Sequence, residues 1–212
     1  MASLQLIGTP LSHFTRKVRI LLAELGVELE LVWAASVLAT APAAYGGNPL
    51  MRVPALVDGD ATLIDSDHIA RYLVRRHDPG DRLGVCSEQV QDLNRLAVVN
   101  GIMANEVVLI LAKRGGLADI DGVAYLRKLG AAIDHGLAWL DHHVDPDAGF
   151  DYRDIAMICL WQHLLHYQLR PGLEGYPRLA ARVARFLERP SVASTTPEVS
   201  LAEAAAAGWK PA

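Results

Sequence analysis

Two short stretches near residues 50 and 65 carry residue types that suit the binding of a small peptide bearing both charges. Val53-Pro54 ends a loop and opens an apolar run, and proline fits there because it cannot donate to a strand ladder. If the Val53-Pro54 bond is cis, the N–H and C=O of Val53 face outward, and an extended peptide can pair with them as an added strand. The stretch therefore predicts a main-chain binding point at Val53.

The second stretch, Asp65-Ser66, follows a predicted strand that ends at Ile64 and opens a helix with Ile69 and Leu73 on one face. A helix N-terminus presents free N–H groups and a partial positive charge, so it can hold a carboxylate. Asp65, one residue earlier, can hold an ammonium group. The alternative is a plain helix cap, because Ser and Asp are both preferred at that position.

Ser12 is a candidate for activating a thiol, because it lies between the first predicted strand and the first predicted helix. A free thiol has a pKa of about 8.5, so only ~3% of it is ionised at pH 7. A hydroxyl that donates to the sulfur favours the thiolate, and one charge-assisted hydrogen bond is large enough to lower the thiol pKa by about 1.5–2. The alternative is again a helix cap. Arg16 and Lys17, which follow on the same helix, are interpreted as a solvated face.

The periodicity of apolar residues supplies the elements that must position these side chains. Residues 3–7 predict a strand, residues 12–25 a helix that Gly26 ends, and residues 28–33 a second strand, which together form a βαβ unit. Two further strands, 55–58 and 61–64, flank an Asp-Gly hairpin turn, and a helix from Ser66 closes at His77. This order predicts a thioredoxin-like domain over residues 1–78.

Beyond a linker at residues 79–86 the strand signals disappear. Helical spacing predicts helices over 87–113 and 121–144, a third from Asp151, and a fourth over 177–188. The segment from Pro190 is expected to be a polar tail of doubtful order. The predicted fold class is therefore α/β plus all-α, with an all-helical domain over residues 87–212.

Composition excludes several classes of protein. The chain has 212 residues, of which 51% are hydrophobic and 21% charged, as in a globular protein. A formal net charge of −4 gives no general attraction to nucleic acid or acidic lipid. We expect no transmembrane helix, because no apolar run reaches ~18 residues, and no signal peptide. With two cysteines and no disulfide framework, a reducing cytoplasm is the expected location.

Taken together, these pieces resemble the cytosolic glutathione transferases, in particular the bacterial members that use a serine. The resemblance rests on Val53-Pro-Ala-Leu56, on Asp65-Ser66 with Ile69 and Tyr72-Leu73, on Ser12-His-Phe-Thr-Arg-Lys-Val-Arg19, on Asp151-Tyr-Arg-Asp154-Ile155, and loosely on Arg189 to Pro197. It covers about residues 3–197, and the order and spacing are more specific than any single piece. The absence of tyrosine from the first 44 residues argues against the branches that use a tyrosine.

The resemblance implies that glutathione is the co-substrate. It places Ser66 on the γ-glutamyl carboxylate, Asp65 on the ammonium group, and Ser12 beside the sulfur. Thr9 is the alternative hydroxyl, because some relatives carry the active residue nearer the strand end. Arg52 would meet the glycyl carboxylate or the cysteinyl backbone, or else is a surface arginine. Val53 and Pro54 would form the main-chain clamp.

The resemblance also implies a second substrate, a small electrophile, that binds between the two domains of one chain. It further implies a two-fold homodimer and a role in detoxification. The wall of that pocket is expected to include five residues: Leu11, His13, Met103, Asn105 and Val107. Two alternatives stay open. One is a non-catalytic interaction module of the same fold, and the other is a glutathione-dependent isomerase or thiol lyase that uses the same site.

Two further groups of residues are assigned structural roles. Asp151 and Asp154 resemble the family's N-capping box. In such a box the Asp151 side chain accepts from N–H groups of the first helical turn, and the Asp154 side chain reaches back to the N–H of Asp151. Four histidines, at positions 142, 143, 163 and 166, are interpreted as surface residues. The two cysteines are not placed to complete a Cys/His metal site, so we expect no metal.

Overall fold

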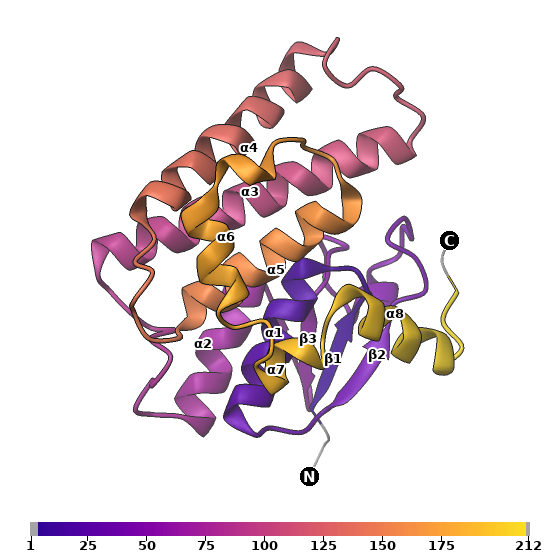
Figure 1. Cartoon of the computed structure of the whole chain (residues 1–212). Coiled ribbons are helices and arrows are strands. Elements are labelled where there is room, and N and C mark those ends of the chain that lie inside the picture. The colour runs from indigo at the N-terminus through magenta and orange to yellow at the C-terminus, as the bar shows by residue number, and fades with distance from the viewer. Residues whose placement is uncertain (1–3, 211–212) are drawn as a thin grey trace. The chain divides into compact units, whose positions relative to one another are not determined.

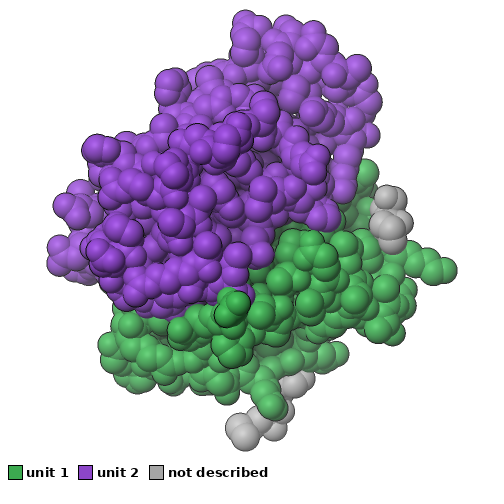
Figure 2. All heavy atoms as spheres, viewed as in Figure 1, with its two compact units in different colours: residues 1–86, 188–212 green, residues 87–187 purple. Residues whose placement is uncertain are grey.

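The computed structural model describes residues 4–210, so residue 3 of the first predicted strand lies outside the described residues. The chain divides into two compact units, coloured separately in Figure 2. The first unit comprises residues 1–86 and 188–212, and the second comprises residues 87–187.

The first unit is built on a four-stranded sheet with the strand order β2-β1-β3-β4 (Figure 1). The strands are β1 Gln5–Gly8, β2 Glu30–Trp33, β3 Ala55–Asp58 and β4 Ala61–Ile64. β1 and β2 are parallel, whereas β3 is antiparallel to both β1 and β4. The predicted βαβ unit and hairpin are thus confirmed, and the thioredoxin-like fold with them.

Helices α1 (His13–Leu25) and α2 (Ser66–His77) cover one face of this sheet. Their apolar residues form a core with every second strand residue, and its buried members are Leu6, Val18, Leu22, Leu56, Ile69 and Leu73. The alternate strand residues, Ile7 and Ala55, belong to a smaller cluster on the other face with Ala34. Period-two alternation therefore fixes which face each strand residue buries.

The short 3₁₀ helix η1 (Pro42–Tyr45) approaches that second face closely. Gly46, directly after it, has a φ of 64°, and a Cβ at this position would lie 2.9 Å from Ile7 Cδ1. A larger residue would therefore combine a left-handed backbone with a clash against the sheet. Glycine here lets the segment that leads to the Val53 loop pack against β1.

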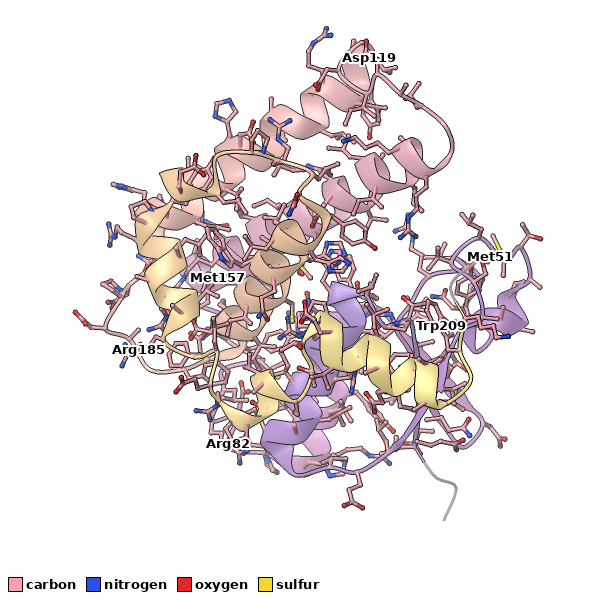
Figure 3. All side chains as sticks on the ribbon, turned by 45° about the vertical axis from the view of Figure 1, so that its right-hand side comes forward. Met51, Arg82, Asp119, Met157, Arg185 and Trp209 are labelled. Carbon is pink, nitrogen blue, oxygen red and sulfur yellow. The ribbon has the colours of Figure 1, made fainter. Side chains whose placement is uncertain are left out.

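The C-terminal segment is ordered, which corrects the expected tail. It forms α7 (Pro190–Ala193) and α8 (Pro197–Ala206), each with proline at its first helical position. Arg19 Nη1 donates to Ser200 Oγ at 2.8 Å, and Trp209, labelled in Figure 3, donates from Nε1 to the Ala34 carbonyl at 2.8 Å. These contacts place residues 188–212 in the first unit, whereas the sequence had grouped them with the helical domain.

The second unit is all-helical. Its elements are α3 (Val90–Arg114), α4 (Ala124–His143), α5 (Tyr152–Tyr167), η2 (Leu173–Gly175) and α6 (Pro177–Ala184). α3 packs against α4 and α5, and α6 packs against α4 and α5. α5 is apolar on all sides and largely buried, as expected of a helix inside a helical unit.

A capping box opens α5, as the sequence predicts. The Asp151 carboxylate accepts from the N–H of Arg153 and of Asp154, and the Asp154 carboxylate accepts from the Asp151 N–H. Arg182 of α6 donates to both oxygens of Asp154 at 2.8 and 2.7 Å. Burial raises the pKa of Asp154 in spite of this pair. The cap therefore also ties α6 to the start of α5.

By length and composition, α3 could cross a membrane. The sequence had predicted no transmembrane helix, because no uninterrupted apolar run is long enough. The mean hydropathy of an 18-residue window of α3 is nevertheless high, because the average tolerates a few polar residues. A single helix of this kind is weak evidence, since buried helices of water-soluble proteins have the same composition. The cytoplasmic location stays a prediction.

Candidate functional site

One cleft in the first unit, of ≈ 150 Å³, is lined by residues from both predicted stretches. They come from the start of α1, the loop before β3, and the junction of β4 with α2. The lining residues are Phe14, Asn48, Leu50, Arg52, Val53, Pro54, Ile64, Asp65 and Ser66. The fold thus brings Arg52, Val53 and Pro54 together with Asp65 and Ser66.

The loop before β3 is held by the buried side chain of Asn48. Its Nδ2 donates to the Arg52 carbonyl at 2.7 Å, and its Oδ1 accepts from the Leu50 N–H at 2.9 Å. Met51, labelled in Figure 3 on this loop, has a φ of 51°. The Asn48 amide thus replaces main-chain partners where the chain turns.

The Val53–Pro54 peptide bond is cis. In the described residues the ladder of β3 begins at Ala55, so the Val53 peptide group lies outside it. Val53 is half-buried and lines the cleft. The Val53 main chain thus lies at the cleft and outside the described β3 ladder.

Asp65 is the N-cap of α2 and has a φ of 75°, which is rare for a residue other than glycine. Its Oδ1 accepts from the N–H of Asp67 at 2.9 Å and of His68 at 3.1 Å. Asp65 is exposed, whereas Ser66 beside it is buried. The arrangement presents one carboxylate and the positive end of a helix to the same cleft.

Ser12 is the N-cap of α1. Its Oγ accepts from the Thr15 N–H at 3.1 Å, and its own N–H donates to the Thr9 carbonyl at 3.1 Å. A hydroxyl has one proton to donate besides its two lone pairs, so capping leaves that proton for a thiolate. Ser12 is half-buried, and Thr9 is buried. The cap is therefore compatible with the thiolate role predicted for Ser12, which stays a prediction.

The five residues predicted for the second-substrate pocket divide between the units. Leu11 and His13 belong to the first unit, and Met103, Asn105 and Val107 lie on α3 of the second. Their common wall stays a prediction. Met103 is fully buried, whereas Asn105 and Val107 are half-buried.

Two interpretations of surface residues are wrong. His163 is buried, and its Nδ1 lies 2.9 Å from Oε2 of the fully buried Glu106, whereas His142, His143 and His166 are exposed as expected. Arg16 and Lys17 are only 4% and 0% exposed. Arg16 donates to Thr195 Oγ1 and to the Val192 carbonyl, because the C-terminal segment covers this side of α1.

Lys17 and Asp67 form an ion pair beside the cleft, with 2.6 Å between Nζ and Oδ1. Sequence reasoning missed it, although a signal was present. Lys17 is three residues after Phe14 and four before Leu21, so it falls in the apolar stripe of its helix. A charge in that stripe needs a buried partner, and an acidic residue in the first turn of the neighbouring helix supplies one.

The far end of α2 is fastened to the hairpin by Asp58, which accepts from the Tyr72 hydroxyl and from Arg76. The Tyr72 hydrogen bond, with help from Arg76, holds the pKa of the Asp58 carboxyl below its ordinary value. The same bond raises the pKa of Tyr72. Together with Asp65 at its first turn, α2 is thus anchored at both ends.

A larger hollow of ≈ 540 Å³ lies between α1 and α7 and is lined by Ala23, Glu24, Arg189, Pro190, Ser191 and Ser194. Its charges are paired with each other: Arg189 donates twice to Glu24 at 2.7 Å, and the Ser191 hydroxyl donates there too. The smaller cleft at Val53 is the better candidate site, because it joins main-chain groups with a helix N-terminus.

Comparison with known proteins identifies relatives of the first unit. Residues 6–81 match the family model for the glutathione S-transferase N-terminal domain. Glutathione S-transferase 4 of maize is 35% identical over 79 residues, which are 36% of this chain and 35% of that protein. The aligned region thus spans about a third of the maize relative.

Solved structures resemble the chain over most of its length. A glutathione S-transferase of Methylobacillus flagellatus with glutathione bound is 27% identical, has a TM-score of 0.77, and covers 92% of this chain and 100% of its own. A glutathione transferase family member of Pseudomonas fluorescens with bound S-(propanoic acid)-glutathione is 29% identical, with a TM-score of 0.72 and the same coverage.

Proposed function

The chain belongs to the glutathione S-transferase family, and we propose that it is an active glutathione transferase that adds the glutathione thiolate to a small electrophile. The observation that carries this proposal is the single cleft in which the Val53 peptide group meets the N-terminus of α2. Two similar solved structures hold glutathione or a glutathione conjugate. The intact Asp65-Ser66 pair also argues against a non-catalytic module of the same fold.

In this proposal each part of glutathione meets a group of matching chemistry. The N–H and C=O of Val53 pair with the cysteinyl backbone, as an added strand. The γ-glutamyl carboxylate lies on the Ser66 N–H and hydroxyl at the positive end of α2, and its ammonium group on Asp65. Arg52, exposed at the rim, meets the glycyl carboxylate or the cysteinyl backbone.

The Ser12 hydroxyl then donates the hydrogen bond that stabilises the thiolate. The hydroxyl donates to the sulfur while its oxygen still accepts from the Thr15 N–H, and this fixes the orientation of the side chain. The field at the N-terminus of α1 favours the same negative charge. The thiol proton first leaves to water or to the carboxylate of the peptide. The thiolate then attacks the electrophilic carbon, and a chlorinated aromatic substrate loses chloride as the carbon–sulfur bond forms.

We further propose that the active form is a two-fold homodimer, as the family resemblance implies. Exposed apolar side chains on α3 and α4 support an interface on the second unit. They are Val90, Leu93, Val108 and Leu111 on α3, and Tyr125 on α4.

Replacing Ser12 by Ala tests the catalytic role. The pKa of bound glutathione should rise by about 1.5–2, and kcat/KM with a chlorinated aromatic substrate should fall by about 25- to 50-fold near pH 6.5. Thiolate absorbance of the binary complex measures the first quantity and steady-state kinetics the second. Ser12→Thr keeps both the hydroxyl and the cap and should stay within about threefold of the wild type.

Thr9→Val is the matched control for the alternative hydroxyl and should keep full turnover. Because Ser12→Ala also removes a helix cap, at about 1 kcal/mol, its thermal unfolding must be recorded alongside. Full turnover by a folded Ser12→Ala protein would remove Ser12 from the chemistry. Retention on immobilised glutathione without turnover on any electrophile would instead favour the non-catalytic module.

A further inference from the structure

Lys17 of α1 carries its charge into the interior of the first unit, where it meets Asp67 of α2. Its side chain is fully buried, and its Nζ lies 2.6 Å from Oδ1 of Asp67. The Asp67 side chain is 19% exposed. A buried ammonium with a partly buried carboxylate is a costly arrangement, and it calls for a reason beyond packing.

Asp67 is directly next to Ser66, which lines the cleft, in the first turn of α2. Its N–H is held by Asp65 Oδ1 at 2.9 Å, so its position in that turn is fixed. Two carboxylates, Asp65 and Asp67, therefore flank the N–H groups proposed to receive a third carboxylate from the ligand. By Coulomb's law, the uncompensated charge of Asp67 would oppose the attraction of the helix N-terminus.

We propose that Lys17 is a positioning residue for glutathione: its ammonium neutralises Asp67, so that the N-terminus of α2 attracts the γ-glutamyl carboxylate. This inference rests on the proposed function and adds a specificity determinant to it. Lys17 does not touch the ligand in this account. It acts through Asp67, and Phe14 on the same helix, whose ring centroid is 5.7 Å from Nζ, lines the cleft itself.

The test uses the opposite signs that two single substitutions should give. Lys17→Met removes the ammonium that pairs with Asp67, so the Kd of glutathione should rise about tenfold. Asp67→Asn removes the carboxylate and leaves the ammonium, so the Kd should equal that of the wild type or be lower. The double variant should return to within about twofold of the wild type, because neither charge remains.

Titration calorimetry of the full chain measures these constants. Lys113→Met, which removes an exposed lysine of the second unit, controls for the change in net charge and should not alter the Kd. A second ligand, γ-aminobutyryl-cysteinyl-glycine, lacks the α-carboxylate of glutathione. With that ligand Lys17→Met should change the Kd by less than twofold.

A purely structural role predicts a different pattern. In that case both single variants weaken binding, and the effect is the same for the ligand without the α-carboxylate. That result overturns the inference. The proposed function still stands in that case, provided that the wild type binds glutathione. If the wild type itself does not bind glutathione, the proposed function fails first. If Lys17→Met does not fold, Asp67→Asn decides: a Kd above the wild-type value overturns the inference.

Discussion

Asp65 combines a backbone cost with a proposed binding role. A non-glycine residue held at such a positive φ costs about 1–3 kcal/mol, and such residues gather at functional sites. The capping hydrogen bonds to Asp67 and His68 offset part of that cost. The remainder is explained if the carboxylate must stand at this point to receive an ammonium group.

This explanation predicts that stability and affinity separate at position 65. Asp65→Gly relieves the backbone and loses only a few tenths of a kcal/mol as an N-cap, so its thermal midpoint should be equal to or above that of the wild type. Its Kd for glutathione should rise at least tenfold, because the ammonium group loses its partner. Thermal unfolding and titration calorimetry measure the two quantities.

Asp65→Asn is the matched control, because it keeps the capping oxygen and the strained backbone but not the charge. It should lose affinity to a similar degree without gaining stability. A glycine variant that binds glutathione as tightly as the wild type would show that the carboxylate has no role in binding.

Single residues differed in how far the sequence revealed them. Asp65 and the Asp151–Asp154 pair act on main-chain groups within a few residues, so local cap chemistry identified them. Lys17 and His163 depend on partners that are far away in the sequence, Asp67 and Glu106. Their charge suggested the surface, and only the fold could supply the partner.

At the scale of elements, periodicity was sufficient for the sheet and for the helices α1 to α6. It was not sufficient for α8, whose apolar and alanine residues do not form a strongly amphipathic face. Contacts with α1 hold this part of the chain, and they join residues about 180 positions apart, such as Arg16 with Thr195. No local pattern records such partners.

The contact of Glu24 on α1 with Arg189 and Ser191 at the start of α7, which we call the tie between these helices, makes stability depend on pH. The hydrogen bonds from Arg189, with that from Ser191, hold the pKa of Glu24 below its ordinary 4.5, although burial acts in the opposite direction. A carboxyl whose pKa is lowered by folding stabilises the fold above its unfolded pKa and loses that contribution as the pH falls through its folded pKa. The wild type should therefore exceed Glu24→Gln in stability at pH 7.

That difference should shrink once the pH falls below about 4.5 and vanish below the folded pKa. Denaturant unfolding between pH 3 and 7 measures it, with Glu28→Gln, an exposed position near the end of α1, as the control. Because Arg189 is 38% exposed, salt should also reduce the difference. A gap between wild type and Glu24→Gln that does not change with pH would contradict this account of the tie.

At the scale of the whole molecule, the sequence predicted the fold class and the order of its parts. It misplaced residues 188–212, because a chain that leaves one unit and returns to it has no signature in composition. Solved structures of the family that cover 92% of the chain agree with the class of fold. No motif in the sequence specifies the identity of the electrophile.

The central claim is that glutathione binds across Val53 and Ser66 with its sulfur at Ser12, and a crystal structure of the chain with glutathione tests it most directly. The account predicts main-chain hydrogen bonds to Val53, the γ-glutamyl group at the start of α2, and a sulfur within ~3.5 Å of Ser12 Oγ. A peptide bound elsewhere, or a sulfur that contacts Thr9 and not Ser12, would contradict it.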